Sequence, residues 1–248
     1  MGAHALPLAG LDGEEVLRVW EASAAAQPVC RSAAILTEAL PDLPVDALDL
    51  PLGRCDTLLL ALRVGTFGSP ISGVTSCPQC GADVDIDADA GAILASLPAA
   101  QLDYDKEYIA EFDQHVLHYR LPTPADLVAV AGSEDPATGI ARRCIWSQTR
   151  GGGPIAFTEL PAEVIARTAE RMSEADPAAD IRFSVCCPEC ATTWSAPLDV
   201  AAVFEVELTG AAMRILGEID ELARRYGWSE QQILALSPVR RQTYMRLR

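Results

Sequence analysis

Apolar residues recur at helical spacing through the first third of the chain. Val16, Leu17 and Trp20 lie on one stripe of such a pattern, which predicts an amphipathic helix. A later run is almost wholly apolar between Pro51 and Gly65, which predicts a buried helix. The helices expected in this region cover residues 13–25, 29–40 and 51–64.

The period changes from that of a helix to that of a strand at Ile71. The sequence ISGVTS leads into the turn Cys77-Pro-Gln-Cys-Gly, and the following ADVDID alternates Val84 and Ile86 with acids. This alternation predicts a strand, a tight turn and a returning strand. Asp89 then precedes a short apolar run, and its side chain is expected to cap a helix there.

The same order of strand, turn, strand and capped helix returns 110 residues later, since residue 77 falls on residue 187 and residue 89 on residue 199. We therefore expect an internal duplication whose halves are related by an approximate two-fold axis. The elements expected in the second copy are a strand over 180–186, a turn over 187–190 and a long helix over 200–225.

The remaining segments predict mostly helices. The sequence QHVLHYRL at 114–121 alternates as a strand, and the run Gly151-Gly152-Gly153-Pro154 indicates a linker over 148–160. Residues 98–105 are expected to form a solvated connection. Further helices, several of them led by proline or a capping residue, are expected over 124–131, 137–146 and 161–174 and after Ser229 and Ser237.

Two CPxC motifs carry the clearest chemical signal. A two-residue spacer lets both thiolates of a pair reach one tetrahedral ion, and two pairs supply the four ligands of a closed structural zinc site. Compact ribbons separate their pairs by about 12–20 residues, whereas here the separation spans much of the chain. We predict one structural zinc ion per chain in a split site, with separate redox dithiols or unligated thiols as open alternatives. The predicted ligands are Cys77, Cys80, Cys187 and Cys190.

No other set of residues predicts a catalytic centre. Four thiolates leave a zinc ion no open position for water or substrate, so the expected site stabilises the fold and does not catalyse. His115 and His118 fall on opposite faces of their expected strand, and the acids of DVDIDAD lack the glycine and distal glutamate of a calcium loop. We expect a non-enzymatic protein. The other cysteines are interpreted as core residues (Cys30, Cys55 and Cys144) and as a less well-spaced competing ligand (Cys186).

The sequence as a whole predicts an α+β fold that is mainly helical, with two zinc-knuckle β-hairpins that form a split zinc ribbon and a long C-terminal helix. Five regions are expected: an N-terminal helical region, the first hairpin with its helix, an inserted strand-helix region with the Gly-rich loop, a helix with the second hairpin, and a C-terminal helical partner-binding region. Their bounds are 1–68, 69–97, 98–160, 161–205 and 206–248.

The composition of the chain limits the classes of function that the protein is expected to have. Half of the 248 residues are hydrophobic, which suffices for a sizeable core, and no apolar run approaches the ~18 residues of a membrane span. The net charge of −16 disfavours general nucleic-acid binding, although the last ten residues carry four arginines and no acid. The start of the chain shows no signal peptide, so a cytoplasmic, reducing setting is expected, in which eight cysteines indicate metal binding or core packing.

Two stretches resemble a known family. Residues 50–68, LPLGRCDTLLLALRVGTFG, with the CPxCG turn that follows, look like hub proteins of T4-like contractile tails. The sequence YGWSEQQILALSPVRRQTY, residues 226–244, is similar to short segments from phage-tail and contractile-injection gene clusters. In these respects the chain resembles the T4-type baseplate hub assembly chaperones of phage tails and extracellular contractile injection systems.

The resemblance implies a protein that binds baseplate, hub and spike proteins during assembly, in the bacterial cytoplasm or within the particle. It implies no small-molecule substrate and no membrane. Aromatic and arginine side chains are frequent interface anchors, and an alternative is that Trp228 and Ile233 fold back on the long helix. The residues expected to bind a partner are Trp228, Ile233, Leu234, Arg240, Arg241 and Tyr244.

Two other function classes stay open. A zinc-ribbon protein that binds nucleic acid or assists transcription would use the arginines at 240, 241, 246 and 248, and would bind in a salt-sensitive way. A thiol-disulfide enzyme would need a low thiol pKa and an exposed sulfur, a state that tight zinc binding excludes.

Overall fold

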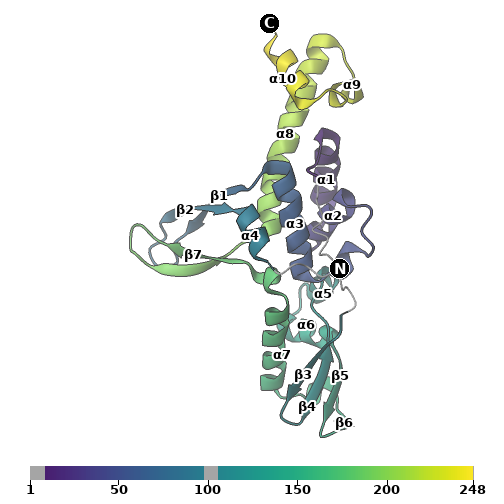
Figure 1. Ribbon diagram of the computed structural model, residues 1–248, viewed down its shortest axis with the longest axis vertical. Coiled ribbons are helices and arrows are strands. Elements are labelled where there is room, and N and C mark those ends of the chain that lie inside the picture. Colours follow the sequence, from purple (N-terminus) through teal and green to yellow (C-terminus); the bar gives the residue numbers. More distant parts are fainter. Residues whose placement is uncertain (1–8, 98–105, 248) are drawn as a thin grey trace.

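The computed structural model describes residues 9–97 and 106–247. The connection expected at 98–105 lies outside these residues. Figure 1 shows an elongated molecule with a helical body in the middle, an arm of paired hairpins on one side, a smaller α+β unit at one end and a C-terminal helical unit at the other. The predicted α+β class, with small sheets and a long C-terminal helix, is confirmed.

The helical body packs four helices around one apolar core. They are α1 (Gly13–Ala25), α2 (Arg31–Ala39), α3 (Leu52–Phe67) and the first half of α8 (Val200–Tyr226). Asp12 and Glu15 form the capping box that starts α1, and Pro28–Cys30 form a 3-10 turn that delays α2 by two residues relative to the prediction. The centre of this core contains Ile35, Leu36, Leu59, Phe204 and Leu208, all fully buried.

A buried ion pair ties α3 to α8. The guanidinium of Arg63 is almost fully buried and donates from Nε and Nη2 to the carboxylate of Glu207, at 2.8 and 2.6 Å. Its Nη1 also donates to the carbonyl of Gly68 at 2.6 Å, directly after α3 ends. A buried arginine is tolerated only when it is paired in this way. These bonds therefore hold the end of α3, where the first hairpin begins.

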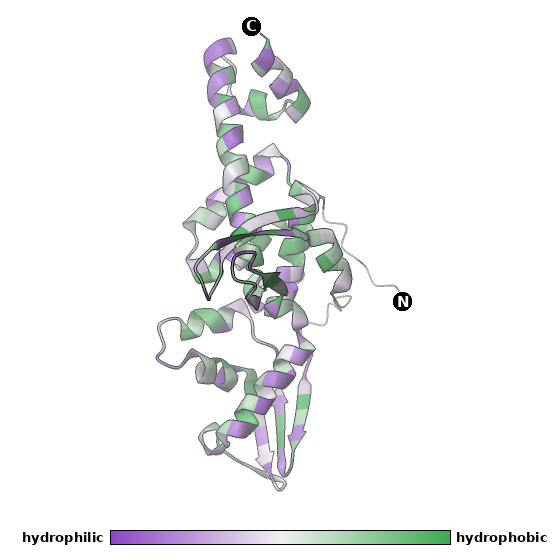
Figure 2. Ribbon diagram, turned by 90° about the vertical axis from the view of Figure 1, so that its left-hand side faces the viewer, coloured by the Kyte–Doolittle hydropathy of each residue, from purple (hydrophilic) through white to green (hydrophobic). Residues whose placement is uncertain are grey.

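The arm consists of two antiparallel hairpins. The first joins β1 (Pro70–Ser76) to β2 (Asp83–Asp89), and the second joins β7 (Arg182–Cys186) to β8 (Thr193–Pro197). Helix α4 (Ala90–Ser96) follows the first hairpin, as α8 follows the second. Figure 2 shows the arm in front of the helical body. The strand-turn-strand order predicted around both CPxC motifs is therefore confirmed.

The inserted unit differs from its prediction. Its sheet has the order β3 (Tyr108–Phe112), β4 (His115–Tyr119), β5 (Ile145–Arg150) and β6 (Gly153–Pro154). The linker expected at 148–160 is wrong in its first part, because β5 and β6 form a hairpin turned by Gly151 and Gly152, both with positive φ. Helices cover this sheet and join it to the body: α5 (Pro124–Val130), α6 (Pro136–Cys144) and α7 (Ala162–Ala175).

The C-terminal unit is built on the second half of α8. Two short helices, α9 (Glu230–Leu234) and α10 (Pro238–Arg246), fold back against it. The predicted capping box of Ser229 with Gln232 is present, and Ser237 caps α10. Across the described ranges, no helix combines the length and the apolar character needed to cross a membrane.

Candidate metal centre and C-terminal surface

The turns of the two hairpins bring four cysteine sulfurs together. The Sγ atoms of Cys77, Cys80, Cys187 and Cys190 all lie within 4.8 Å of one another. Sγ of Cys77 lies 3.6 Å from Sγ of Cys190, and Sγ of Cys80 lies 3.7 Å from Sγ of Cys187. A tetrahedral ion with Zn–S bonds of about 2.3 Å would set its ligand sulfurs about 3.8 Å apart. The donor set and its spacing fit one four-coordinate metal ion.

Both short sulfur contacts join one motif to the other. Exchanging the two motifs converts the Cys77–Cys190 contact into the Cys80–Cys187 contact, as an approximate two-fold axis through the cluster requires. The four sulfurs thus have the approximate two-fold arrangement expected from the sequence. The strand registers agree, because Thr75 pairs with Val84 as Val185 pairs with Trp194.

The two turns use the same backbone hydrogen bonds. The amide of Cys77 donates to Ala82 at 2.8 Å, and the amide of Gly81 donates back to Cys77 at 2.9 Å. In the second turn, Cys187 and Ala191 make the equivalent bonds, both at 2.9 Å. The fifth residue of each turn is left-handed, with φ of 75° at Gly81 and 58° at Ala191. These turns aim both sulfurs of each motif toward the other hairpin.

A small apolar cluster supports the four sulfurs from behind. Val84, Val185 and Ala196 are buried between the hairpins. Cys77 and Cys187 are buried against this cluster, whereas Cys80 and Cys190 are exposed. The metal centre therefore has a dry inner side and a solvent-facing outer side, and its position is fixed by packing as well as by the turns.

Electrostatics disfavour four free thiolates in this space. The hydroxyl and amide of Thr192 lower the pKa of Cys190 to about 6. The amide of Ala82 acts to lower the pKa of Cys80, but the thiols of the other three clustered cysteines, Cys190 first among them, raise it to about 12. One sulfur therefore ionises readily while another stays protonated, since like charges this close oppose each other. A bound cation would remove that opposition.

The other cysteines lie outside the cluster. Cys55 and Cys144 are buried as predicted, and burial raises the pKa of both thiols to about 12, which makes them poor nucleophiles. Cys30 is only partly buried. Cys186 is exposed next to Cys187, and its Sγ lies near the carbonyl of Cys187. The preference for Cys187 over Cys186 as the converging cysteine is confirmed.

The predicted partner-binding residues divide between the interior and the surface. Ile233 is fully buried, and Leu234 packs against the helical core. Arg241 is also buried, where its Nε donates to Glu218 at 2.9 Å and its Nη1 to the carbonyl of Leu236 at 2.8 Å. The expectation that Ile233 and Arg241 face a partner is thus corrected, because Ile233 is buried within the chain and Arg241 is buried against Glu218 of α8.

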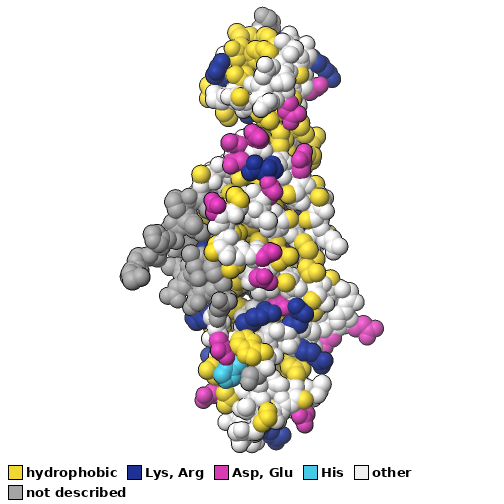
Figure 3. Space-filling model, turned by 90° about the vertical axis from the view of Figure 1, so that its right-hand side faces the viewer, with side chains coloured by type: hydrophobic (Ala, Val, Ile, Leu, Met, Phe, Trp, Pro, Cys, Tyr) yellow, Lys and Arg dark blue, Asp and Glu magenta, His cyan; other side chains and the backbone are white. Residues whose placement is uncertain are grey.

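The aromatic residues form a half-exposed cluster. The ring of Trp228 stacks on Tyr226 with centroids 4.6 Å apart and lies perpendicular to the ring of Tyr244, with centroids 4.9 Å apart. Arg240 is exposed nearby in sequence, as are Val239 and Leu247, which the sequence analysis did not single out. Figure 3 shows hydrophobic side chains gathered on this unit, with arginine or lysine on both sides.

Comparison with known proteins identifies no relative. No family model, curated protein or solved structure matches the chain. The function is therefore inferred from the cysteine cluster, the C-terminal surface and the sequence itself.

Proposed function

We propose that the protein is a non-enzymatic, zinc-stapled component that binds other tail proteins during assembly of a contractile tail or injection-system baseplate. The convergence of four cysteine sulfurs within 4.8 Å carries the zinc part of the proposal. Four thiolates at tetrahedral spacing are typical of structural zinc sites. The baseplate part rests on the sequence resemblance of residues 50–68 and 226–244.

The zinc ion would act as a staple between distant parts of the chain. The first hairpin leaves α3 and leads into α4, and the second follows the inserted unit and leads into α8. A metal ion bound by both turns would therefore hold together the segments before and after the inserted unit, and it would fix the position of the start of α8. Because an unfolded chain has no preformed site, most of the metal-binding energy becomes folding energy.

The C-terminal unit is the surface that we propose for partner binding. Residues 226–244, which resemble segments of tail-protein gene clusters, form the end of the molecule beyond the helical body (Figure 1). Val239 is 75% exposed and Leu247 is 51% exposed. Exposed apolar residues, aromatic rings and arginines are all common at interfaces. The contact surface is then Trp228, Val239, Arg240, Tyr244 and Leu247.

The test is affinity capture from cells that assemble the particle. We expect the tagged wild-type protein to capture hub, spike or wedge proteins, and the Val239→Asp variant to lose them. Val206→Asp is the matched control, because Val206 is 73% exposed on α8, outside the C-terminal unit. Equal capture by both variants would reject this surface. Normal particles in a strain without the protein would reject the assembly role.

A further inference from the structure

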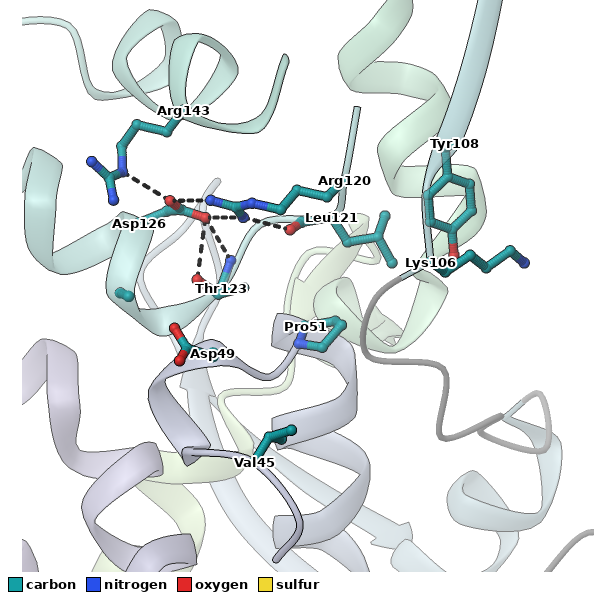
Figure 4. A pocket seen from close by; sticks show the side chains of 11 residues that line it. Val45, Asp49, Pro51, Lys106, Tyr108, Arg120, Leu121, Thr123, Asp126 and Arg143 are labelled. Atoms are coloured by element: carbon teal, nitrogen blue, oxygen red, sulfur yellow. Dashed lines mark hydrogen bonds and ion pairs between the residues drawn. The ribbon is translucent and has the colours of Figure 1, made fainter. Parts of the chain in front are cut away.

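A pocket of about 370 Å³ lies where the helical body meets the inserted unit, away from both surfaces described above. The body side comes from the segment before α3, and the other side from β3, from the end of β4 and from α5 and α6 (Figure 4). The residues used below are Val45, Asp49, Pro51, Lys106, Tyr108, Leu121 and the charged group around Asp126.

A fully buried carboxylate organises the arginine side of this pocket. Asp126 accepts two hydrogen bonds from Arg120, from Nη1 at 2.6 Å and Nη2 at 2.8 Å, and one from Nε of Arg143 at 2.8 Å. The amide of Thr123 donates to it at 3.0 Å. Burial acts to raise the pKa of Asp126, but these donors outweigh burial and lower it to about 2. Asp126 is thus a permanent anion that holds two guanidinium groups in place.

The guanidinium groups still face solvent on their outer sides. The side chain of Arg120 is 37% exposed and that of Arg143 is 44% exposed. Asp126 engages only Nε of Arg143, and the two Nη groups bond to none of the described residues. These donors are therefore available to water or to a bound anion.

The charge balance of the pocket is opposite to that of the chain. Lys106, Arg120 and Arg143 line it against the carboxylates of Asp49 and Asp126, in a protein whose net charge is −16. Lys106 lies across the pocket from Arg143 (Figure 4), with Nζ 4.8 Å from the ring centre of Tyr108. Fixed cations in a concave site raise the local concentration of anions.

The remaining wall includes the apolar side chains of Val45, Pro51 and Leu121 and the ring of Tyr108. We propose that this pocket binds a small organic anion. Its phosphate or carboxylate head lies against the arginines held by Asp126, and its apolar body lies against Val45, Pro51 and Leu121. Arginine suits such heads because its planar donors match their oxygens, and a wall that combines charged and apolar side chains suits a ligand with a charged head and an apolar body.

Isothermal titration calorimetry of the full chain at low salt tests the proposal with four probes. Phenyl phosphate and phenylacetate carry a head and a ring, inorganic phosphate carries the head alone, and phenol carries the ring alone. We expect at least one of the first two to bind more tightly than inorganic phosphate and phenol. Which of the two binds more tightly distinguishes a phosphate ligand from a carboxylate ligand. No tighter binding by either would overturn the proposal.

Three exposed residues supply the matched variants. Removing the cation in Lys106→Ala should weaken binding of the better ring-bearing probe, and removing the anion in Asp49→Asn should strengthen it, each by about three- to tenfold. Arg150→Ala removes a positive charge from β5 outside the pocket and should leave binding unchanged. Equal weakening by Lys106→Ala and Arg150→Ala would show a general attraction to the protein and would overturn the assignment. None of the three side chains is among the hydrogen-bond or ion-pair partners of Asp126 in the described structure, so we expect the variants to fold.

Discussion

In the hairpins β1–β2 and β7–β8, the cysteines, the left-handed turn residues and the capping aspartates occupy matching positions that are 110 residues apart in the sequence. The residues around these shared positions differ. The first carries four exposed aspartates on β2, at positions 83, 85, 87 and 89, whereas Thr193, Ser195 and Pro197 occupy three of the matching positions on β8. The first leads into a helix of 7 residues and the second into one of 27 residues. The cysteines and the turn geometry that both copies share are what a four-cysteine site needs.

The largest effect should come from removing one ligand in either copy. Because both motifs bind one ion, Cys77→Ser and Cys187→Ser should each abolish metal binding and lower the free energy of unfolding by about 4 kcal/mol or more. Urea unfolding in the presence of zinc measures both losses. They should be equal within error, since either change removes the same staple.

Cys186→Ser is the matched control for these variants. Position 186 corresponds to position 76 in the first copy, where serine already stands, and the Cys186 sulfur is not part of the cluster. We expect wild-type metal binding and stability. A loss from Cys77→Ser with none from Cys187→Ser would show that the two motifs do not share an ion.

The second effect concerns the pH dependence of stability, which should involve the capping aspartate of the second copy and not that of the first. Asp89 and Asp199 each accept a hydrogen bond of 2.9 Å from the third residue beyond them. Burial, followed by the charges of Asp199 and Asp176, raises the pKa of Asp56 to about 7. Because this pKa is raised on folding, the protonated carboxyl favours the folded state, and stability falls as pH rises from about 4 through 7. Only the second cap takes part in this coupling.

Asp199→Asn should therefore flatten the pH dependence, and Asp89→Asn should not. Asparagine is a good N-cap, so the changes remove charge and keep the cap. Between pH 5 and pH 8, we expect the free energy of unfolding to fall by about 1 kcal/mol less in Asp199→Asn than in wild type. Urea unfolding at both pH values measures the difference. Asp56→Asn should remove most of the slope. The same slope in Asp56→Asn and wild type would contradict the assignment to Asp56.

The smallest effect should come from the turn residues. A left-handed backbone costs an L-residue about 1 kcal/mol relative to glycine. Gly81→Ala should therefore destabilise the first turn by about 1 kcal/mol, and Ala191→Gly should stabilise the second by a similar or smaller amount. An added Cβ at Gly81 meets nothing within 4 Å, so no steric clash confuses the comparison. Shifts of the same sign in thermal melts would show that the turns are not equivalent.

The sequence predicted the arm well because its signals are local. Ligand spacing, alternation and a capping aspartate all act within a few residues, and the 110-residue repeat supplied a second copy of each. The inserted sheet was harder to predict, because β5 starts at Ile145 directly after α6 with no glycine or proline at the boundary. The glycines after β5 turn a hairpin, and sequence alone does not separate such a turn from a linker.

Ion pairs between residues on different elements could not be predicted from the sequence. Arg241 was expected to bind a partner because arginines are frequent interface anchors, but Glu218 on α8 neutralises it and allows its burial. In the same way, no local motif joins Arg120 and Arg143 to Asp126. Such groups become visible only when the fold brings their elements together.

The most direct test of the account is the metal content of the purified protein, measured by elemental analysis together with the Cys77→Ser, Cys187→Ser and Cys186→Ser variants. A split staple predicts one zinc ion per chain in the wild type and in Cys186→Ser, and none in the other two. A wild-type protein without zinc whose four clustered thiols all react freely, or one that keeps zinc after loss of either motif, would contradict it.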